Sequence, residues 1–329
     1  SWPARMAEAL EAPALAREVA QAAERLRAHV VQTPLVPCPW MSDELDAEVR
    51  WKLENVQHTG SFKLRGATHA LLRMPAAQRA RGVVAASSGN HGLGLAAACQ
   101  RLGVRAQVFV PSTTPADKRR AIERFGAEVQ VHGDDCVVTE GHARSYASAQ
   151  GRVYVSPYND AEVVAGQGTV MVELLQQWPE VDAVYVAVGG GGLISGMAAF
   201  GKSRWPALEV VGCSPAASAA MAEYVRRGEL LDVPCGDTWS DSTAGGVEPG
   251  AITYPWCRDL VDRYVDVGED EIARGMRDAL ARQHLLVEGA VGVAIAACRA
   301  DRARRGARVA VVVCGGNLPY DLLQRLTAG

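Results

Sequence analysis

Residues 54–67 read Glu-Asn-Val-Gln-His-Thr-Gly-Ser-Phe-Lys-Leu-Arg-Gly-Ala, and the rest of the chain is interpreted outward from this stretch. The strand-like residues 49–53 precede it, and apolar residues with helical spacing begin at Leu64. Lys63 is therefore predicted to lie in a polar turn between a strand and a helix. A lysine amine in such a turn can form a Schiff base with a carbonyl group, but most lysines are simply solvated charges, so other stretches must support this interpretation.

The composition is that of a large globular protein with balanced charge. The chain has 329 residues, of which 48% are hydrophobic, and this length suggests about two domains. The 34 Lys and Arg residues nearly balance the 37 Asp and Glu residues, so no basic face for nucleic acid is predicted. No apolar run is long enough to cross a membrane.

The cysteines indicate a reducing compartment. Eight are scattered along the chain without a CxxC pair or zinc-type spacing, so no metal site is predicted. Most lie in apolar runs, which is typical of reduced core thiols. The first residues also lack the layout of a signal peptide, and a cytoplasmic protein is expected.

Short apolar strands alternate with helices along most of the chain. The predicted strands span residues 83–86, 106–110, 128–131, 183–188, 210–213 and 309–313. This alternation predicts an α/β fold with two open, mostly parallel sheets that have helices on both faces. Residues 73–152 are expected to form a small domain, and residues 1–72 together with 153–329 a large one.

Three turns that are rich in glycine or small polar residues directly follow predicted strands. They are Ser-Ser-Gly-Asn-His-Gly at 87–92, Gly-Gly-Gly-Gly-Leu at 189–193 and Cys-Gly-Gly-Asn at 314–317. Because ligands of open parallel sheets bind outside the carboxyl ends of strands, these turns could converge with the lysine turn. The tetraglycine turn suits an anionic phosphate, since its backbone amides open a helix. Taken alone, the first turn could be only a helix cap and the last an ordinary strand end.

Together, the four stretches resemble the motifs of the serine/threonine dehydratase family, the fold-type II pyridoxal-phosphate enzymes that include serine racemase. Residues 61–67 resemble the motif around the cofactor lysine, and residues 87–92 the loop for substrate and cofactor. Residues 189–193 resemble the phosphate loop, and residues 314–317 the last motif of the family. The resemblance covers nearly the whole chain and implies a fold like that of the tryptophan synthase β subunit, with a large cofactor-binding domain and a small domain that carries the substrate loop.

The resemblance implies how the chain would bind pyridoxal 5′-phosphate. Lys63 would hold the cofactor as a Schiff base and later move the Cα proton, Phe62 would flank the cofactor, and Asn90 would bond to its ring hydroxyl. Cys314 would face the pyridine nitrogen, where a serine is common in relatives. The complete set of expected cofactor-binding residues is Phe62, Lys63, Asn90, Gly189, Gly190, Gly191, Gly192, Leu193, Glu288, Cys314 and Asn317.

The substrate site is expected in the small domain. The resemblance implies that Ser87, Ser88, Gly89 and His91 surround the carboxylate of a small amino-acid substrate. Ser88 also aligns with the opposite-face base of serine racemases, so it is a candidate catalytic residue together with Lys63. Because pure dehydratases share this serine, it does not discriminate between the two activities.

The leading functional prediction is a lyase. It would be a pyridoxal-phosphate dependent ammonia-lyase, or dehydratase, that converts L-threonine or L-serine into a 2-oxo acid and ammonia by α,β-elimination. The alternatives are a serine-type racemase, a β-replacement enzyme, or a dehydratase of a rarer substrate such as 3-hydroxyaspartate, phenylserine or a hydroxyectoine-derived intermediate. A cofactor-free binding protein would require an idle Lys63. Relatives suggest a homodimer.

Two features depart from the family pattern. Residues 213–220 read Cys-Ser-Pro-Ala-Ala-Ser-Ala-Ala where members with a divalent-cation site carry Glu-Pro and further acids. Because magnesium and calcium need oxygen ligands that are usually charged, no such ion is expected there. The sequence also ends soon after residues 314–317, so isoleucine feedback through a regulatory extension is not expected.

Overall fold

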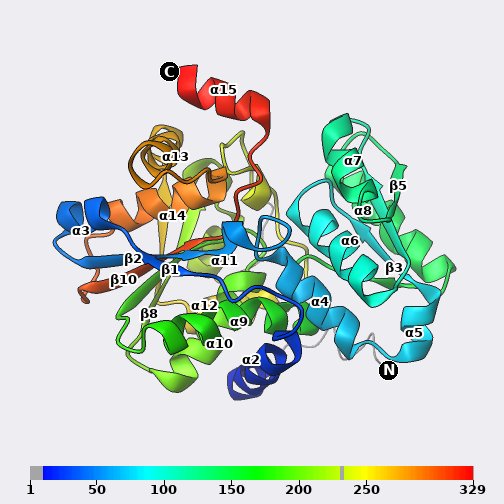
Figure 1. Ribbon diagram of the computed structural model, residues 1–329, viewed down its shortest axis with the longest axis horizontal. Coiled ribbons are helices and arrows are strands. Elements are labelled where there is room, and N and C mark those ends of the chain that lie inside the picture. The colour runs from blue at the N-terminus through cyan, green and yellow to red at the C-terminus, as the bar shows by residue number, and fades with distance from the viewer. Residues whose placement is uncertain (1–9, 230–232, 329) are drawn as a thin grey trace.

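The computed structural model describes residues 10–229 and 233–328 and contains two β-sheets (Figure 1). The larger sheet has the strand order β1-β2-β10-β7-β8-β9, and the smaller sheet has the order β5-β4-β3-β6. Strands β1 and β2 are antiparallel, whereas the other neighbouring strands are parallel. The prediction of an α/β fold with mostly parallel sheets is confirmed.

The strands agree with most of the predicted ones. The larger sheet consists of β1 (Leu35–Pro37), β2 (Glu48–Leu53), β7 (Ala183–Ala187), β8 (Glu209–Pro215), β9 (Arg263–Val267) and β10 (Arg308–Val313). The smaller sheet consists of β3 (Val83–Ala86), β4 (Ala106–Val110), β5 (Glu128–Val131) and β6 (Val153–Tyr154). Strands β1, β6 and β9 were not predicted, because β1 and β6 have too few residues to show a pattern and β9 is a half-buried edge strand that includes two charged residues.

Helices connect the strands and cover the sheets. The α-helices are α2 (Ala12–Leu26), α3 (Pro39–Leu45), α4 (Lys63–Arg73), α5 (Ala76–Arg81), α6 (Asn90–Leu102), α7 (Ala116–Glu123), α8 (Cys136–Ala149), α9 (Ala161–Gln177), α10 (Gly192–Arg204), α11 (Ala220–Arg227), α12 (Thr253–Leu260), α13 (Glu269–Gln283), α14 (Gly289–Ala300) and α15 (Tyr320–Ala328). Short 3₁₀ helices are η1 (Glu54–Val56), η2 (Ala216–Ser218) and η3 (Asp241–Thr243).

The main hydrophobic core surrounds the larger sheet. Helices α13 and α14 lie on one side of this sheet, and α9, α10 and α12 lie on the other (Figure 1). Because both faces are covered, β10 can be a continuous apolar run, and its residues 309–313 are fully buried. No helix in the described ranges 10–229 and 233–328 is both long and apolar enough to cross a membrane.

The smaller sheet has a core of its own that reaches beyond the predicted small domain. Strand β6 pairs with β3, so the smaller sheet extends to Tyr154, two residues past the predicted boundary. Leu64 and Leu71 of α4 pack in the same cluster as Leu95 of α6, although α4 was assigned to the large domain except for its last residue. The two-domain division itself stays a prediction, and residues 1–9, 230–232 and 329 of it lie outside the described part.

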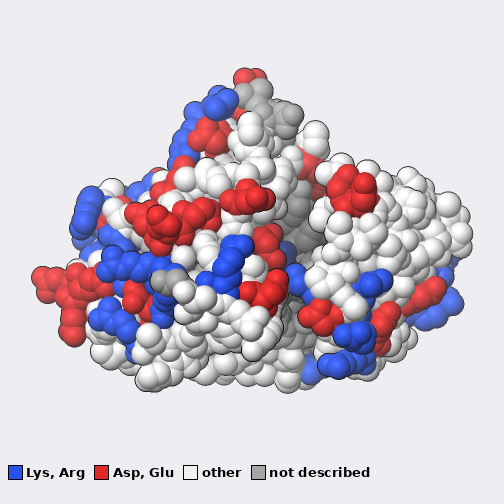
Figure 2. Space-filling model, turned by 90° about the horizontal axis from the view of Figure 1, so that it is seen from above, with Lys and Arg blue, Asp and Glu red and all other residues white. Residues whose placement is uncertain are grey.

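The order of the strands brings the predicted turns together. Strands β2, β10 and β7 are parallel neighbours, so the lysine turn, residues 314–317 and residues 189–193 all follow strand ends at one edge of the larger sheet. Ser61 forms an isolated β-bridge with Gly315, which joins two of these turns directly. Seen from above, the surface is indented between the parts of the protein that contain the larger and the smaller sheet. Acidic and basic side chains are interspersed on this face (Figure 2).

Candidate active site

Lys63 is the first residue of α4 and lies where the two sheets meet. The Phe62 amide donates to the Cys314 carbonyl over 3.1 Å, and Lys63 Nζ donates to the Pro157 carbonyl over 3.1 Å. The ammonium also lies 5.2 Å from the centre of the Phe62 ring. Burial lowers the pKa of Lys63 to about 8, an effect that the Glu288 carboxylate partly opposes. More of the amine is therefore neutral near physiological pH, and the neutral amine is the nucleophilic form.

A buried network of charged side chains surrounds Arg65, which lies two residues after Lys63. Arg65 donates to both oxygens of Glu54 over 2.8 and 2.7 Å and to Glu173 Oε1 over 2.7 Å. Lys52 Nζ donates to Glu173 Oε2 over 2.7 Å. Burial alone would raise the pKa of Glu54, but Arg65 and a hydrogen bond from Thr33 outweigh it and lower this pKa. Two cations and two carboxylates thus compensate one another inside the protein.

The tetraglycine turn connects β7 to α10 and has the properties of an anion site. The first N–H groups of a helix have no partner within the helix, and the helix dipole favours negative charge there. Thr253 Oγ1 donates to the Gly190 carbonyl over 2.7 Å and fixes the turn. The Tyr158 ring packs against Gly190 so closely that a Cβ at this position would lie 2.3 Å from the ring. Only glycine allows this approach without a shift, and the turn fits a phosphate group.

Four side chains form a hydrogen-bonded group across the junction of the two sheets. Asn90 Nδ2 donates to Glu288 Oε1 and Oε2 over 3.1 and 2.9 Å. Asn317 Nδ2 donates to Asn90 Oδ1 over 2.7 Å, and Ser242 Oγ donates to Glu288 Oε1 over 2.9 Å. Burial raises the pKa of Glu288, although Asn90 and Ser242 oppose it. The structure therefore brings Asn90, Glu288 and Asn317 together.

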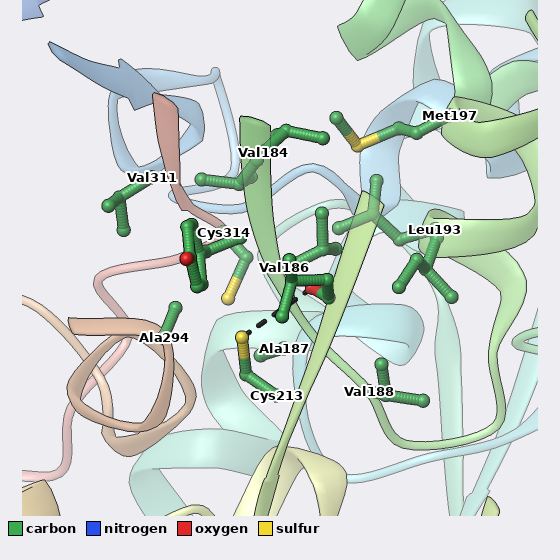
Figure 3. Close-up of a cluster of buried hydrophobic side chains, with 14 of the residues drawn as sticks. Val184, Val186, Ala187, Val188, Leu193, Met197, Cys213, Ala294, Val311 and Cys314 are labelled. Carbon is green, nitrogen blue, oxygen red and sulfur yellow. Dashed lines mark hydrogen bonds between the residues drawn. The ribbon is translucent and has the colours of Figure 1, made fainter. Parts of the chain in front are cut away.

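Cys314 follows β10 and is a buried, neutral thiol. Figure 3 shows its side chain and that of Cys213 among apolar residues that include Val186 and Val311. Burial holds the pKa of Cys314 well above its ordinary value. The Cys314 thiol also lies close to the Lys63 amine. That Cys314 faces a cofactor nitrogen stays a prediction.

The predicted substrate loop connects β3 to α6. Ser87 Oγ accepts a hydrogen bond from the Gly89 amide over 3.3 Å, while Ser88 is half-buried. His91 is buried, and its Nε2 lies 2.8 Å from the Val155 carbonyl, so Nε2 carries the hydrogen. Burial, together with the charge of Lys63, lowers the pKa of His91 to about 3. A neutral ring protonated at Nε2 leaves Nδ1 as an acceptor, which cannot donate to a substrate carboxylate.

Sequence reasoning missed Pro157, Tyr158 and Ser242. Pro157 and Tyr158 follow the short β6, and Ser242 lies in η3. None of the three belongs to a motif that can be recognised without the fold. Among the described residues, no group of three or more His, Cys, Asp or Glu side chains could hold a metal ion.

Known proteins share both the sequence and the fold. A family model described as "Pyridoxal-phosphate dependent enzyme" matches residues 26–315. The L-threonine ammonia-lyase of Geobacter sulfurreducens is 37% identical over 91% of this chain and 75% of its own length. The catabolic L-threonine dehydratase TdcB of Escherichia coli K12 is 34% identical over 96% of both chains. The structure of maize serine racemase has a TM-score of 0.89 and 27% identity, and covers 95% of this chain and 96% of that one.

These matches confirm the fold and the cofactor that the four motifs predicted. The geometry is compatible with them, because an amine of lowered pKa and a glycine turn at a helix start are the two features that a phosphorylated aldehyde requires. The chain therefore belongs to the pyridoxal-phosphate dependent enzymes, within the fold-type II serine/threonine dehydratase family.

Proposed function

We propose that this protein is an ammonia-lyase that converts a β-hydroxy amino acid, L-threonine or L-serine, into a 2-oxo acid and ammonia. The observation that carries the proposal is the position of Lys63 at the junction of the two sheets. The turn that precedes Lys63 is bonded to the turn of residues 314–317, and Glu288, the partner of Asn90, lies close to the Lys63 amine. The names of two relatives that align with more than 90% of this chain support the same activity and favour L-threonine.

The residues of this chain would divide the work as follows. Bound pyridoxal phosphate supplies an electron-accepting ring for the electrons released at Cα. The amides of residues 189–193 would bind the phosphate, Phe62 would flank the ring, and Asn90 Nδ2 would donate to the ring oxygen. Lys63 Nζ, once free, would take the Cα proton, which suits an amine with a pKa of about 8. Cys314 would remain a neutral neighbour of the ring, because burial keeps its thiol protonated.

A racemase is the second candidate, because the fold is so similar to that of maize serine racemase. For this activity, a second base must reach Cα from the face opposite Lys63. Ser88 is the candidate, since it lies half-buried in the substrate loop. Ser87 and Gly89 are proposed to bind the substrate carboxylate in either reaction.

Substrate panels separate these candidates. The holoenzyme is incubated with L-threonine, L-serine, 3-hydroxyaspartate and phenylserine, and the release of 2-oxo acid and ammonia is measured. Equal amounts of both products from L-threonine or L-serine are expected. If a chiral column instead shows that the enzyme interconverts the substrate enantiomers and no 2-oxo acid forms, the protein is a racemase.

Replacing Gly190 with alanine is expected to weaken the binding of pyridoxal phosphate by about tenfold or more, because making room for the methyl group has the cost of overpacking. The new Cβ would lie 2.3 Å from the Tyr158 ring and force the phosphate turn or the ring to move. Titration of the apoprotein with the cofactor measures the effect. Gly236→Ala is the matched control, because its Cβ would meet the nearest atom at 3.5 Å, and equal affinities of the two variants would contradict the prediction.

The pH dependence of cofactor attachment should report the pKa of Lys63. The group reacts as a neutral amine, so the attachment rate should rise with pH and level off above about 8, where an ordinary lysine would still be mostly protonated. The attachment rate is measured as the change in absorbance after apoprotein and cofactor are mixed. Nα-acetyl-lysine, which keeps a free side-chain amine, provides the reference. A rate that keeps rising in parallel with Nα-acetyl-lysine would show that Lys63 has an ordinary pKa.

Chelators are expected to leave the activity unchanged. Residues 213–220 offer hydroxyl groups but no carboxylate, and Ser218 Oγ already accepts a hydrogen bond from the Gly245 amide over 3.1 Å. Initial rates are compared with and without EDTA. Lost activity that magnesium restores would show a divalent site.

We also infer a cytoplasmic homodimer. All eight cysteines are free, and six of them are buried, which supports a reducing compartment. The homodimer rests on the resemblance to the family, and sedimentation of the holoenzyme tests it.

A further inference from the structure

We propose that Asn317 and Glu288 are positioning residues that act through Asn90. They hold the Asn90 side chain with its Nδ2 turned toward the bound cofactor, and they need not touch the cofactor themselves. This inference rests on the proposed function, in which Asn90 donates to the ring oxygen. It also assigns separate tasks to residues that the sequence grouped together only as cofactor-binding.

Asn317 determines which end of the Asn90 amide points away from the site. Its Nδ2 donates to Asn90 Oδ1 over 2.7 Å and to the Thr59 carbonyl over 2.9 Å. An amide nitrogen carries two hydrogens and donates only, so its partner in Asn90 must be the oxygen. The contact to Thr59 fixes the Asn317 amide in turn, because a carbonyl only accepts.

Glu288 selects the same orientation from the other side. Its two oxygens lie 3.1 and 2.9 Å from Asn90 Nδ2, and an ionised carboxylate can only accept. One N–H of Asn90 can serve both oxygens, which leaves the second N–H for a ligand. Glu288 reaches this place because Gly315 has no side chain, since a Cβ there would lie 2.4 Å from Glu288 Oε2.

The two contacts also fix Asn90 across the junction of the sheets. Asn90 begins α6, which packs against the smaller sheet. Glu288 directly precedes α14, which packs against the larger sheet, and Asn317 follows β10 of that sheet. One turn further along α6, a Cβ on Gly94 would be 3.3 Å from the Lys63 Cβ. The Asn90 amide is thus held by residues of the larger sheet, at the start of a helix that packs against Lys63.

The decisive variant is Asn317→Asp. An aspartate at this place accepts only, so the Asn90 amide must reverse to donate to it, and Asn90 Oδ1 then faces the Glu288 carboxylate. The binding of pyridoxal phosphate should weaken by about tenfold, the size expected when a hydrogen bond is replaced by a repulsive contact. The absorption maximum of the bound cofactor should shift, and kcat should fall with little change in KM. Asn317→Ala should have a smaller effect, because it frees Asn90 without reversing it.

A double variant tests whether Asn317 acts through Asn90. In an Asn90→Ala background, Asn317→Asp should change cofactor affinity by less than about twofold, since residues coupled through one partner are not additive. Gln100→Ala, an exposed amide on the same helix, is the control and should bind the cofactor like the wild type. Additive losses, or a lower melting temperature with unchanged cofactor affinity and spectrum, would overturn the proposal.

These readouts separate this inference from the proposed function. Cofactor affinity and absorbance need no substrate, so a wild type without ammonia-lyase activity would refute the function alone. An active wild type whose Asn317→Asp variant keeps the wild-type affinity and spectrum would refute the positioning role alone.

Discussion

Replacing Lys63 with alanine should lower kcat for 2-oxo acid release by about a thousandfold or more, since a positioned acid–base group alone contributes factors of this order. The variant loses both the covalent attachment of the cofactor and the amine that moves the Cα proton. Steady-state kinetics with saturating cofactor measure the loss. The absorbance of a covalently attached cofactor should disappear as well.

The fold should survive this change. Burial disfavours the charged form of Lys63, so removing it relieves a cost rather than breaking a compensated pair. Lys202→Ala is the matched control, because Lys202 forms an ion pair with Asp262 at the end of α10, away from the lysine turn. A folded Lys63→Ala protein that keeps most of the wild-type kcat would contradict the assignment.

Replacing Arg65 with alanine is expected to lower the free energy of unfolding by about 3–5 kcal/mol, the usual cost of removing one partner of a buried ion pair. Arg65 is fully buried and bonds to Glu54 and Glu173 at once. Without the guanidinium, Glu54 would keep its Thr33 partner but lose its main compensating charge. Urea denaturation of the apoprotein measures this change.

Two further variants make the test specific. Arg65→Lys keeps the positive charge but cannot form two forked contacts, so its stability should lie between those of the wild type and Arg65→Ala. Arg101→Ala removes an exposed arginine that donates to the His29 carbonyl, and it should change the unfolding free energy by less than about 0.5 kcal/mol. Similar unfolding curves for Arg65→Ala and Arg101→Ala would show that the buried network does not stabilise the protein.

The sequence could predict the elements around the site because its signals are local. The run at 309–313 is apolar at every position, and the glycines at 189–192 directly follow another strand, so each turn could be located before the fold was known. Their convergence follows from parallel pairing, which places the ends of β2, β10 and β7 at one edge.

The sequence could not predict interactions that depend on distant partners. Lys52 and Glu54 have the composition of a solvated surface, yet both are fully buried because Arg65 and Glu173 reach them in the fold. Ser242 is similar, since nothing beside it in the chain indicates its bond to Glu288. Strand β6 was missed for a different reason, because two residues are too few for any periodicity.

Helix α4 packs both against α6, which covers the smaller sheet, and against α9, which covers the larger sheet. Its apolar side, with Leu64 and Leu71, packs into the core of the smaller sheet, while the turn before it is tied to the end of β10 through Ser61 and Phe62. The other side of α4 is bonded to α9, since the Gly66 amide donates to Gln167 Oε1 over 2.9 Å and His69 Nδ1 lies 2.7 Å from the Glu162 carbonyl. Any relative movement of the two sheets would therefore have to shear one of the two packed sides of α4, the helix that Lys63 begins.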